Sequence, residues 1–307
     1  MNFISDTQVR ATLSNADVYA AMEQAFRSYG QDQAVNLPRA RASVGGRTIS
    51  TMGAVLLDGP LPVMGVKSYP TIEGKFNFMI SLFCANTGAA LAMVQGNALT
   101  EFRTAAVTLL ASHHLANKEP ECLAIFGSGA QARAHAAALV PAFPFKEVLV
   151  IDDFGNAGEF AASLSDAHGV PARVATSAEA VQRADFIVTA TRAKTPLFDG
   201  RLVRPGTFVA AIGSSKPDTR ELDDALLGRA ACIAVEDTRQ ALAEAGEFVM
   251  ATPDLRSALP VVPLGAFVNG TATYQRHAQD ITIYKSVGIG LEDVALARML
   301  HQRLSMA

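Results

Sequence analysis

Apolar residues near the N-terminus recur at helical spacing. The positions i, i+4, i+7, i+8 and i+11 are Val18, Met22, Ala25, Phe26 and Tyr29. With capping residues at 14–17 and a glycine at 30, this pattern predicts an amphipathic helix. From about residue 35 to 97 the apolar runs become short and are interrupted by glycine and proline, which predicts an antiparallel sheet. A helix is expected to follow over 100–115.

From about residue 119, strand-like and helix-like segments alternate. Apolar runs such as 122–126, 147–151 and 207–212 are separated by helix-like segments such as 130–140 and 156–168. Alternation of this kind predicts βαβ units around a parallel sheet. The C-terminal tail combines a strand-like run at 281–284 with a final helix. We expect this tail to pack back on the N-terminal part of an α/β protein.

Length, composition and charge indicate the size of the fold and which classes of partner the protein has. A chain of 307 residues suits two domains or one large α/β domain, and 50% apolar residues can fill buried sheets. The net charge of -3 without a basic run indicates no nucleic-acid partner. No apolar stretch is long enough to span a bilayer, and no signal peptide is evident, so no membrane partner is expected.

The cysteines and histidines give no sign of a metal site. The three cysteines are far apart in the chain, and no histidine has metal-ligand spacing to another histidine or cysteine. A sparse, odd cysteine count is typical of a reducing compartment, so we expect a cytoplasmic protein without a metal. A serine hydrolase is not supported either, because no GxSxG motif is present.

A glycine-rich turn follows the apolar strand 122–126. Gly127 can make the tight turn, Gly129 lets backbone N–H groups approach a pyrophosphate, and Ala132 permits close packing of the next helix on the strand. A motif of this kind also occurs in loops that bind no dinucleotide. Here strand, turn and helix follow one another in the required order, which favours a dinucleotide site.

Two acids end the next strand-like run. Asp152 follows Gly127 by 25 residues, close to the spacing of the acid that binds the adenosine ribose. A carboxylate there accepts from the 2′-hydroxyl and repels a 2′-phosphate. Asp152 and Asp153 therefore favour NAD over NADP, with Asp152 the better candidate for the ribose and Asp153 a possible cap for the next element.

Cations in the N-terminal part could hold an anionic substrate. Lys67 follows the apolar run 63–66, and Arg103 begins a helix that is apolar over 105–110. Arginine offers a planar fork for a carboxylate, and lysine adds a point charge or a proton. The alternative is that both are ordinary half-exposed charges. Arg39 and Arg41 are further candidates.

At these positions the chain resembles the ornithine cyclodeaminase / mu-crystallin family. The resemblance covers nearly the whole chain. It rests on the segments 65–67, 99–106, 127–132, 213–223 and 284–288. The blocks 99–106 and 213–223 are the most specific of these, whereas the glycine turn alone would not identify the family.

The resemblance implies a Rossmann doubly wound parallel sheet plus an α+β substrate and dimerisation domain. The expected substrate domain is 1–118 completed by 281–307, the Rossmann domain is 119–280, and the assembly is a homodimer. The resemblance further implies that Arg39, Lys67 and Arg103 bind the substrate carboxylate and that Lys67 takes part in proton transfer. The residues assigned to the cofactor are Arg103, Thr104, Gly127, Ser128, Gly129, Ala130, Gln131, Asp152, Asp153, Thr191, Gly213 and Ser286.

One departure from the family pattern bears on the reaction. Ornithine cyclodeaminases carry a catalytic aspartate where this chain has Ser215, and a hydroxyl cannot replace a carboxylate base. The surrounding segment is closer to ketimine reductases and pyrroline-2-carboxylate reductases. The predicted function is NAD(P)H-dependent reduction of α-imino acids to L-amino acids, with Lys67 and Ser215 as catalytic candidates. The alternatives are an ornithine cyclodeaminase, an alanine-type amino-acid dehydrogenase, or a non-catalytic NAD-binding crystallin-like protein.

Overall fold

The protein divides into two compact units. The structure, a computed structural model, describes residues 1–306. The mixed-sheet unit holds residues 1–107 and the C-terminal segment from Gly288, and the parallel-sheet unit is Thr108–Val287. In the structure the chain therefore changes unit at 107/108 and 287/288, whereas the sequence placed the boundaries at 118/119 and 280/281. The difference at the tail has a clear cause, because strand 281–285 pairs inside the parallel sheet.

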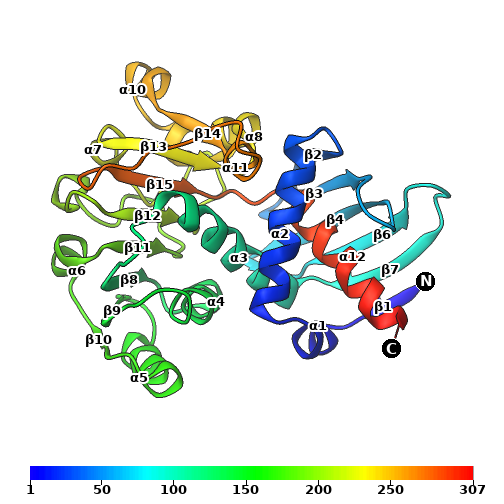
Figure 1. Cartoon of the computed structure of the whole chain (residues 1–307), viewed down its shortest axis with the longest axis horizontal. Helices are drawn as coiled ribbons and strands as arrows, with labels where there is room; N and C mark the ends of the chain where they lie inside the picture. The colour runs from blue at the N-terminus through cyan, green and yellow to red at the C-terminus, as the bar shows by residue number, and fades with distance from the viewer. Residues whose placement is uncertain (307) are drawn as a thin grey trace. The chain divides into compact units, whose positions relative to one another are not determined.

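The mixed-sheet unit is built on a seven-stranded sheet (Figure 1). The strand order is β1-β7-β6-β4-β3-β2, with β5 beside β4. Strand β1 pairs with β7 in parallel, and the other pairs are antiparallel, as the short apolar runs predicted. The strands are β1 (Asn2–Ile4), β2 (Ala34–Val44), β3 (Arg47–Leu56), β4 (Val63–Ile72), β5 (Lys75–Phe76), β6 (Met79–Cys84) and β7 (Ala90–Gln95).

Helices cover this sheet. They are α1 (Asp6–Thr12), α2 (Asn15–Gly30), the start of α3 (Asn97–Leu115) and α12 (Gly290–Met306). The hydroxyl of Ser14 caps α2 by accepting from the Asp17 N–H. Helix α12 packs on β3, β4 and α2, and its residues 291–297 are all buried. The first half of α12 is therefore a core element of this unit.

The parallel-sheet unit is the predicted Rossmann-type fold. Its eight strands are all parallel in the order β10-β9-β8-β11-β12-β15-β13-β14 (Figure 1). The strands are β8 (Cys122–Phe126), β9 (Glu147–Ile151), β10 (Ala172–Val174), β11 (Phe186–Thr189), β12 (Phe208–Ala211), β13 (Ala230–Val235), β14 (Val261–Pro263) and β15 (Ile281–Lys285). The central strands β8, β11, β12 and β15 are buried along their whole length, as expected of a sheet covered on both faces.

Short helices connect these strands. They are α4 (Ala130–Leu139), α5 (Ala157–His168), α6 (Ser177–Arg183), η1 (Gly200–Leu202), α7 (Asp224–Leu227), α8 (Thr238–Glu244), α9 (Gly246–Val249), α10 (Pro253–Ala258) and α11 (Leu264–Val268). None of the helices formed by residues 1–306 combines the length and the apolar character needed to cross a membrane.

Candidate functional site

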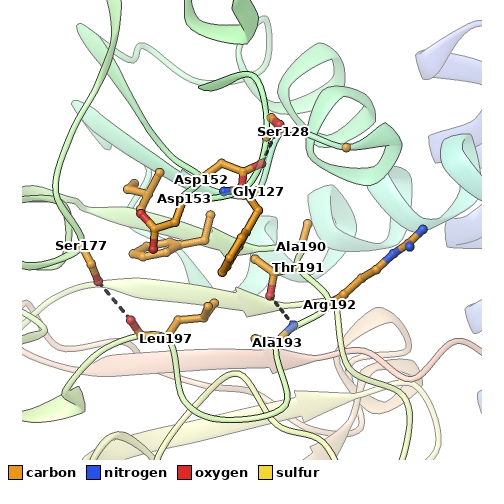
Figure 2. Close-up of a pocket in the computed structure, with 15 residues that line it drawn as sticks. Gly127, Ser128, Asp152, Asp153, Ser177, Ala190, Thr191, Arg192, Ala193 and Leu197 are labelled. Carbon is orange, nitrogen blue, oxygen red and sulfur yellow. Dashed lines mark hydrogen bonds between the residues drawn. The ribbon is translucent and has the colours of Figure 1, made fainter. Parts of the chain in front are cut away.

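A cavity of about 530 Å³ lies at the carboxyl ends of β8, β9 and β11 (Figure 2). The chain runs outward from β8 through β9 to β10 and then returns to place β11 on the other side of β8. The crevice at such a reversal of strand order is where doubly wound sheets bind ligands. The cavity is lined by Phe126, Gly127, Ser128, Gly129, Ile151, Asp152, Asp153, Phe154, Gly155, Ser177, Ala190, Thr191, Arg192, Ala193 and Leu197.

The glycine turn suits a diphosphate. Gly127 has φ +105, and a Cβ there would lie 2.7 Å from the carbonyl oxygen of Ala190. Only glycine avoids both the strain and the clash. A Cβ at Gly129 would meet nothing within 4 Å, so this position leaves open space over the turn. Gly129 is also the N-cap of α4, and it makes no side-chain cap hydrogen bond. The N–H groups at a helix N-terminus bind phosphate well.

Asp152 is positioned at the end of β9 for an adenosine ribose. Its Oδ2 accepts from the Ser128 hydroxyl at 2.6 Å (Figure 2). Its Oδ1 accepts from the Phe154 N–H at 3.0 Å. Burial raises the pKa of Asp152, but hydrogen bonds from Ser128, Phe154 and Gly155 outweigh that effect and leave the pKa below its ordinary value. The group is therefore an anion at neutral pH. Asp153 is exposed and also lines the cavity.

The structure brings together six of the residues that the sequence assigned to the cofactor. They are Gly127, Ser128, Gly129, Asp152, Asp153 and Thr191. Ala130 and Gln131 form the first turn of α4 beside them. The sequence reading found Thr191 but missed its neighbours Ala190, Arg192 and Ala193, which also line the cavity.

The hydrogen bonds that Thr191 makes within the protein limit what it can offer a ligand. Its hydroxyl donates to Oε1 of Glu221 at 2.7 Å, and its N–H donates to the same oxygen at 2.8 Å. A hydroxyl has one proton to donate, so Thr191 can offer a ligand in this cavity only its methyl group or an oxygen lone pair. The Gly213 N–H is also committed, to Oε2 of Glu221 at 2.7 Å.

Glu221 belongs to a buried cluster that joins the ends of three strands. We define the Glu221 cluster as Glu221, Glu247 and Lys285, which are at most 1% exposed. The Lys285 Nζ lies 3.0 Å from Oε2 of Glu247 and donates to the carbonyl oxygen of Ser214 at 2.7 Å. The cluster thus holds the turns after β11 and β12 against β15. Sequence reasoning missed all three residues.

Ser286 and Glu236 form a separate buried contact. The Ser286 hydroxyl donates to Oε1 of Glu236 at 2.6 Å, and the Tyr284 hydroxyl donates to the same oxygen at 3.0 Å. Ser286 is thus placed at the carboxyl end of β15, and its proton is used within the protein. Ser215 lies in the loop after β12, half-buried.

The predicted substrate-binding cations meet in the mixed-sheet unit. The Lys67 Nζ on β4 donates to Oδ1 of Asp293 at 2.8 Å and to the Thr100 hydroxyl at 2.6 Å. Arg103 on α3 donates to Oε2 of Glu292 at 2.5 Å, and its Nε lies 3.6 Å from Oδ1 of Asp293. Lys67 is 1% exposed and Arg103 6%, so neither is the ordinary half-exposed charge that the sequence left open.

Arg39 on β2 completes this group. Its Nη2 donates to the carbonyl oxygen of Gly288 at 2.9 Å. A Cβ at Gly288 would lie 2.8 Å from Nη1 of Arg103, so this glycine gives the Arg103 guanidinium room. We define the Lys67 cluster as Arg39, Lys67, Arg103, Glu292 and Asp293. Arg41 is exposed.

Opposing effects act on the pKa of Lys67, and together they lower it. Burial lowers its pKa, the charge of Asp293 raises it, and the charges of Arg103 and Arg39 lower it further, which gives a pKa of about 8. Lysine titrates near 10 in water. Lys67 is therefore a cation at neutral pH that loses its proton far more readily than an ordinary lysine, as a proton donor needs to.

The two acids of the Lys67 cluster were missed from the sequence. Glu292 and Asp293 are both fully buried in the first turn of α12. Acids in a first helical turn are common because they interact with the helix dipole. The available signal was their place in the otherwise apolar run 287–296.

Aromatic side chains lie beside Lys67. The Lys67 Nζ is 4.2 Å from the centre of the Phe78 ring. Phe78 stacks on Phe76 at 5.6 Å and meets Tyr69 edge-on at 4.9 Å. These three rings form an apolar wall next to the charged cluster.

Thr104 lies one residue after Arg103 on α3. Its hydroxyl donates to the Thr100 carbonyl oxygen at 2.7 Å, within its own helix. Its assignment to the cofactor stays a prediction, as do those of Arg103, Ala130, Gln131, Gly213 and Ser286. Over residues 1–306, no group of three or more His, Cys, Asp or Glu side chains is placed to hold a metal ion.

Two curated relatives are similar to this chain over most of its length. The ketimine reductase mu-crystallin of Mus musculus is 35% identical over 228 residues, which are 74% of this chain and 69% of the relative. A Delta(1)-pyrroline-2-carboxylate reductase of Bacillus cereus (strain ATCC 10987 / NRS 248) is 32% identical over 231 residues, 74% of this chain and 71% of the relative.

Solved structures match the whole chain. A probable ornithine cyclodeaminase from Bordetella pertussis Tohama I has a TM-score of 0.96 and 42% identity, covering 100% of this chain and 97% of that one. Thermococcus litoralis Delta(1)-pyrroline-2-carboxylate reductase, in complex with NADH and L-proline, has a TM-score of 0.93 and 25% identity, covering 100% and 98%. An archaeal alanine dehydrogenase dimer with bound NAD has a TM-score of 0.92 and 27% identity, covering 100% and 97%.

The family model of the ornithine cyclodeaminase/mu-crystallin family matches residues 1–307. The resemblance that the sequence motifs indicated is confirmed by this match and by the two curated relatives. This protein belongs to the ornithine cyclodeaminase/mu-crystallin family.

Proposed function

We propose that this protein is an NAD-dependent reductase that converts α-imino acids, such as pyrroline-2-carboxylate, to L-amino acids. The observation that carries the proposal is the Lys67 cluster, in which a buried, easily deprotonated lysine lies among arginines suited to a carboxylate. The names of the curated relatives support the same reaction class.

The parallel-sheet unit would hold the dinucleotide. Its turn at Gly127 and Gly129 and the uncapped start of α4 fit the diphosphate, and Asp152 fits the unphosphorylated ribose. The NAD-bound and NADH-bound relatives support this choice over NADP. The chemistry that reduced NAD supplies when bound is donation of a hydride to an imine carbon.

The mixed-sheet unit would hold the imino acid. Three cations of the Lys67 cluster outnumber its two acids, so the cluster attracts a carboxylate. Arg39 and Arg103 can bind that group through their planar forks. The wall of Tyr69, Phe76 and Phe78 suits the hydrocarbon body of a cyclic imine.

Lys67 would supply positive charge and a proton. Reduction of an imine to an amine consumes one hydride and one proton, and protonation of the nitrogen makes the imine carbon electrophilic. A lysine with a lowered pKa releases its proton at a pH where an ordinary lysine does not. Ser215, a neutral residue, would at most donate a hydrogen bond to the substrate or to water.

Turnover assays test this proposal directly. The purified protein is mixed with pyrroline-2-carboxylate and either NADH or NADPH, and loss of the absorbance of the reduced cofactor is followed. We expect turnover, with NADH preferred. Formation of proline from ornithine without net NADH consumption would instead indicate a cyclodeaminase, and turnover of pyruvate with ammonia would indicate an alanine dehydrogenase. No reaction with any of these substrates would refute the proposal.

The assay should show a defined pH dependence. Lys67 holds its proton below its pKa of about 8 and loses it above. Because reduction needs that proton, we expect kcat/KM to be highest below pH 8 and to fall about tenfold per pH unit above it. Oxidation of the amino acid should show the opposite trend. A reduction rate that rises across this range would contradict the role of Lys67 as the acid.

A homodimer and a cytoplasmic location complete the proposal. The archaeal alanine dehydrogenase, a dimer, supports the first, and the sparse cysteines support the second.

A further inference from the structure

Among the described residues, only one of the two carboxylate oxygens of Asp293 has a hydrogen-bond partner. Its Oδ1 accepts from Lys67 at 2.8 Å and lies 3.6 Å from Nε of Arg103. Its Oδ2 is buried and has no hydrogen-bond partner among residues 1–306. A buried carboxylate oxygen without a partner is unfavourable because it has lost its hydrogen bonds to water, so native proteins rarely leave one. Such an atom beside a binding site indicates a ligand that donates to it.

The Lys67 cluster indicates the chemical nature of a group that could donate to Oδ2 of Asp293. A substrate carboxylate has no proton to give at neutral pH and would be repelled by Asp293, so the carboxylate must lie toward the arginines. The other polar group of an α-imino acid is its nitrogen, one carbon away. A protonated imine or an ammonium group carries both a positive charge and N–H donors, which complement a carboxylate.

We propose that Asp293 binds the substrate nitrogen, with Oδ2 accepting its N–H. This assignment rests on the proposed function. During reduction Lys67 gives its proton to the imine nitrogen, the hydride forms the new C–H bond, and the C=N π pair becomes the lone pair of the amine nitrogen, which takes a second proton from water to become the ammonium ion. Asp293 contacts the nitrogen in both its iminium and its ammonium states.

The surroundings of Asp293 support this role. The charged groups that act on Lys67 are Asp293 from α12, Arg103 from α3 and Arg39 from β2, with Thr100 as its neutral partner. Burial lowers the pKa of Lys67 and Asp293 alone among these charges raises it. One carboxylate therefore both keeps the proton donor charged and faces the atom that receives the proton.

Two ligands that differ in one ring atom distinguish a loss of nitrogen binding from a general loss of ligand binding. L-Proline carries a ring ammonium, and tetrahydro-2-furoate has the same ring and carboxylate with an oxygen in place of the nitrogen. Inhibition constants for both are measured on the wild type and on Asp293→Asn, using turnover of pyrroline-2-carboxylate with NADH. We expect the wild type to prefer proline and the variant to lose about tenfold to a hundredfold of that preference, the value of a charge-assisted hydrogen bond.

Glu292→Gln is the matched control. Glu292 acts on Arg103, so its loss should weaken both ligands by the same factor and keep the preference for proline. If Asp293→Asn does not fold, the double variant Lys67→Met/Asp293→Asn removes both charges of the pair, and direct binding of the two ligands is compared instead.

The outcomes are distinct. An Asp293→Asn variant that keeps the wild-type preference, or weakens both ligands equally, overturns the role of Asp293 alone. A wild type that neither reduces the imine nor binds either ligand overturns the proposed function and this assignment with it.

Discussion

Replacement of Lys67 by methionine is expected to lower kcat/KM for imine reduction by about 10²–10⁴-fold, the usual contribution of a positioned acid, and to leave the binding of NADH unchanged. Methionine keeps most of the volume of the buried lysine stem but has no proton to give. Arg103 remains within 3.6 Å of Asp293, which limits the cost of the unpaired acid.

Lys75→Met is the control for this substitution. Lys75 lies on β5, in the same sheet, but is exposed, so its loss should change neither turnover nor binding. Turnover is measured by cofactor absorbance, and NADH binding is measured by calorimetry. Lys67→Met with near wild-type turnover would remove the lysine from the mechanism. An inactive wild type that binds NADH would instead favour the non-catalytic alternative.

Replacement of Lys285 by methionine is expected to lower the free energy of unfolding by about 3–5 kcal/mol, as when one partner of a buried ion pair is removed. Lys285 is 1% exposed and lies 3.0 Å from the fully buried Glu247. Its loss leaves that carboxylate, Glu221 and the Ser214 carbonyl in the core without their cation. The effect is measured by urea denaturation in the absence of cofactor.

Arg183→Met is the comparison for Lys285→Met. Arg183 pairs with Glu147 in the same unit, but about half of its side chain is exposed. Exposed ion pairs add little stability, so this variant should unfold close to the wild-type midpoint. Equal destabilisation by both substitutions would show that burial of the Glu221 cluster does not matter for stability.

Local patterns were sufficient to predict the parallel sheet and the glycine turn after β8. A strand, a glycine turn and a helix in direct succession leave few ways to fold, and Asp152 was found because its distance along the chain from Gly127 is set by one βαβ unit. Lys67 and Arg103 were candidates from their sequence context, which allowed a surface position as well, and the family resemblance then assigned them to the substrate carboxylate.

Residues whose role depends on burial could not be predicted in this way. Glu292 and Asp293 look like ordinary acids of a first helical turn, and only the packing of α12 on β3 and β4 makes them partners of Arg103 and Lys67. Glu221 and Glu247 are 26 residues apart and meet only because the sheet brings their loops together. Neither spacing has a local signature.

The position of β15 has a consequence for how the chain is made. This strand is synthesised after every other strand of its sheet, and it lies between β12 and β13. Until residues 281–285 are made, no strand joins β12 to β13, and contacts so distant in sequence form slowly. The very next segment, α12, fills the core of the other unit. If synthesis stopped near residue 280, both units of the chain would be incomplete. Their exposed apolar surfaces would then favour aggregation.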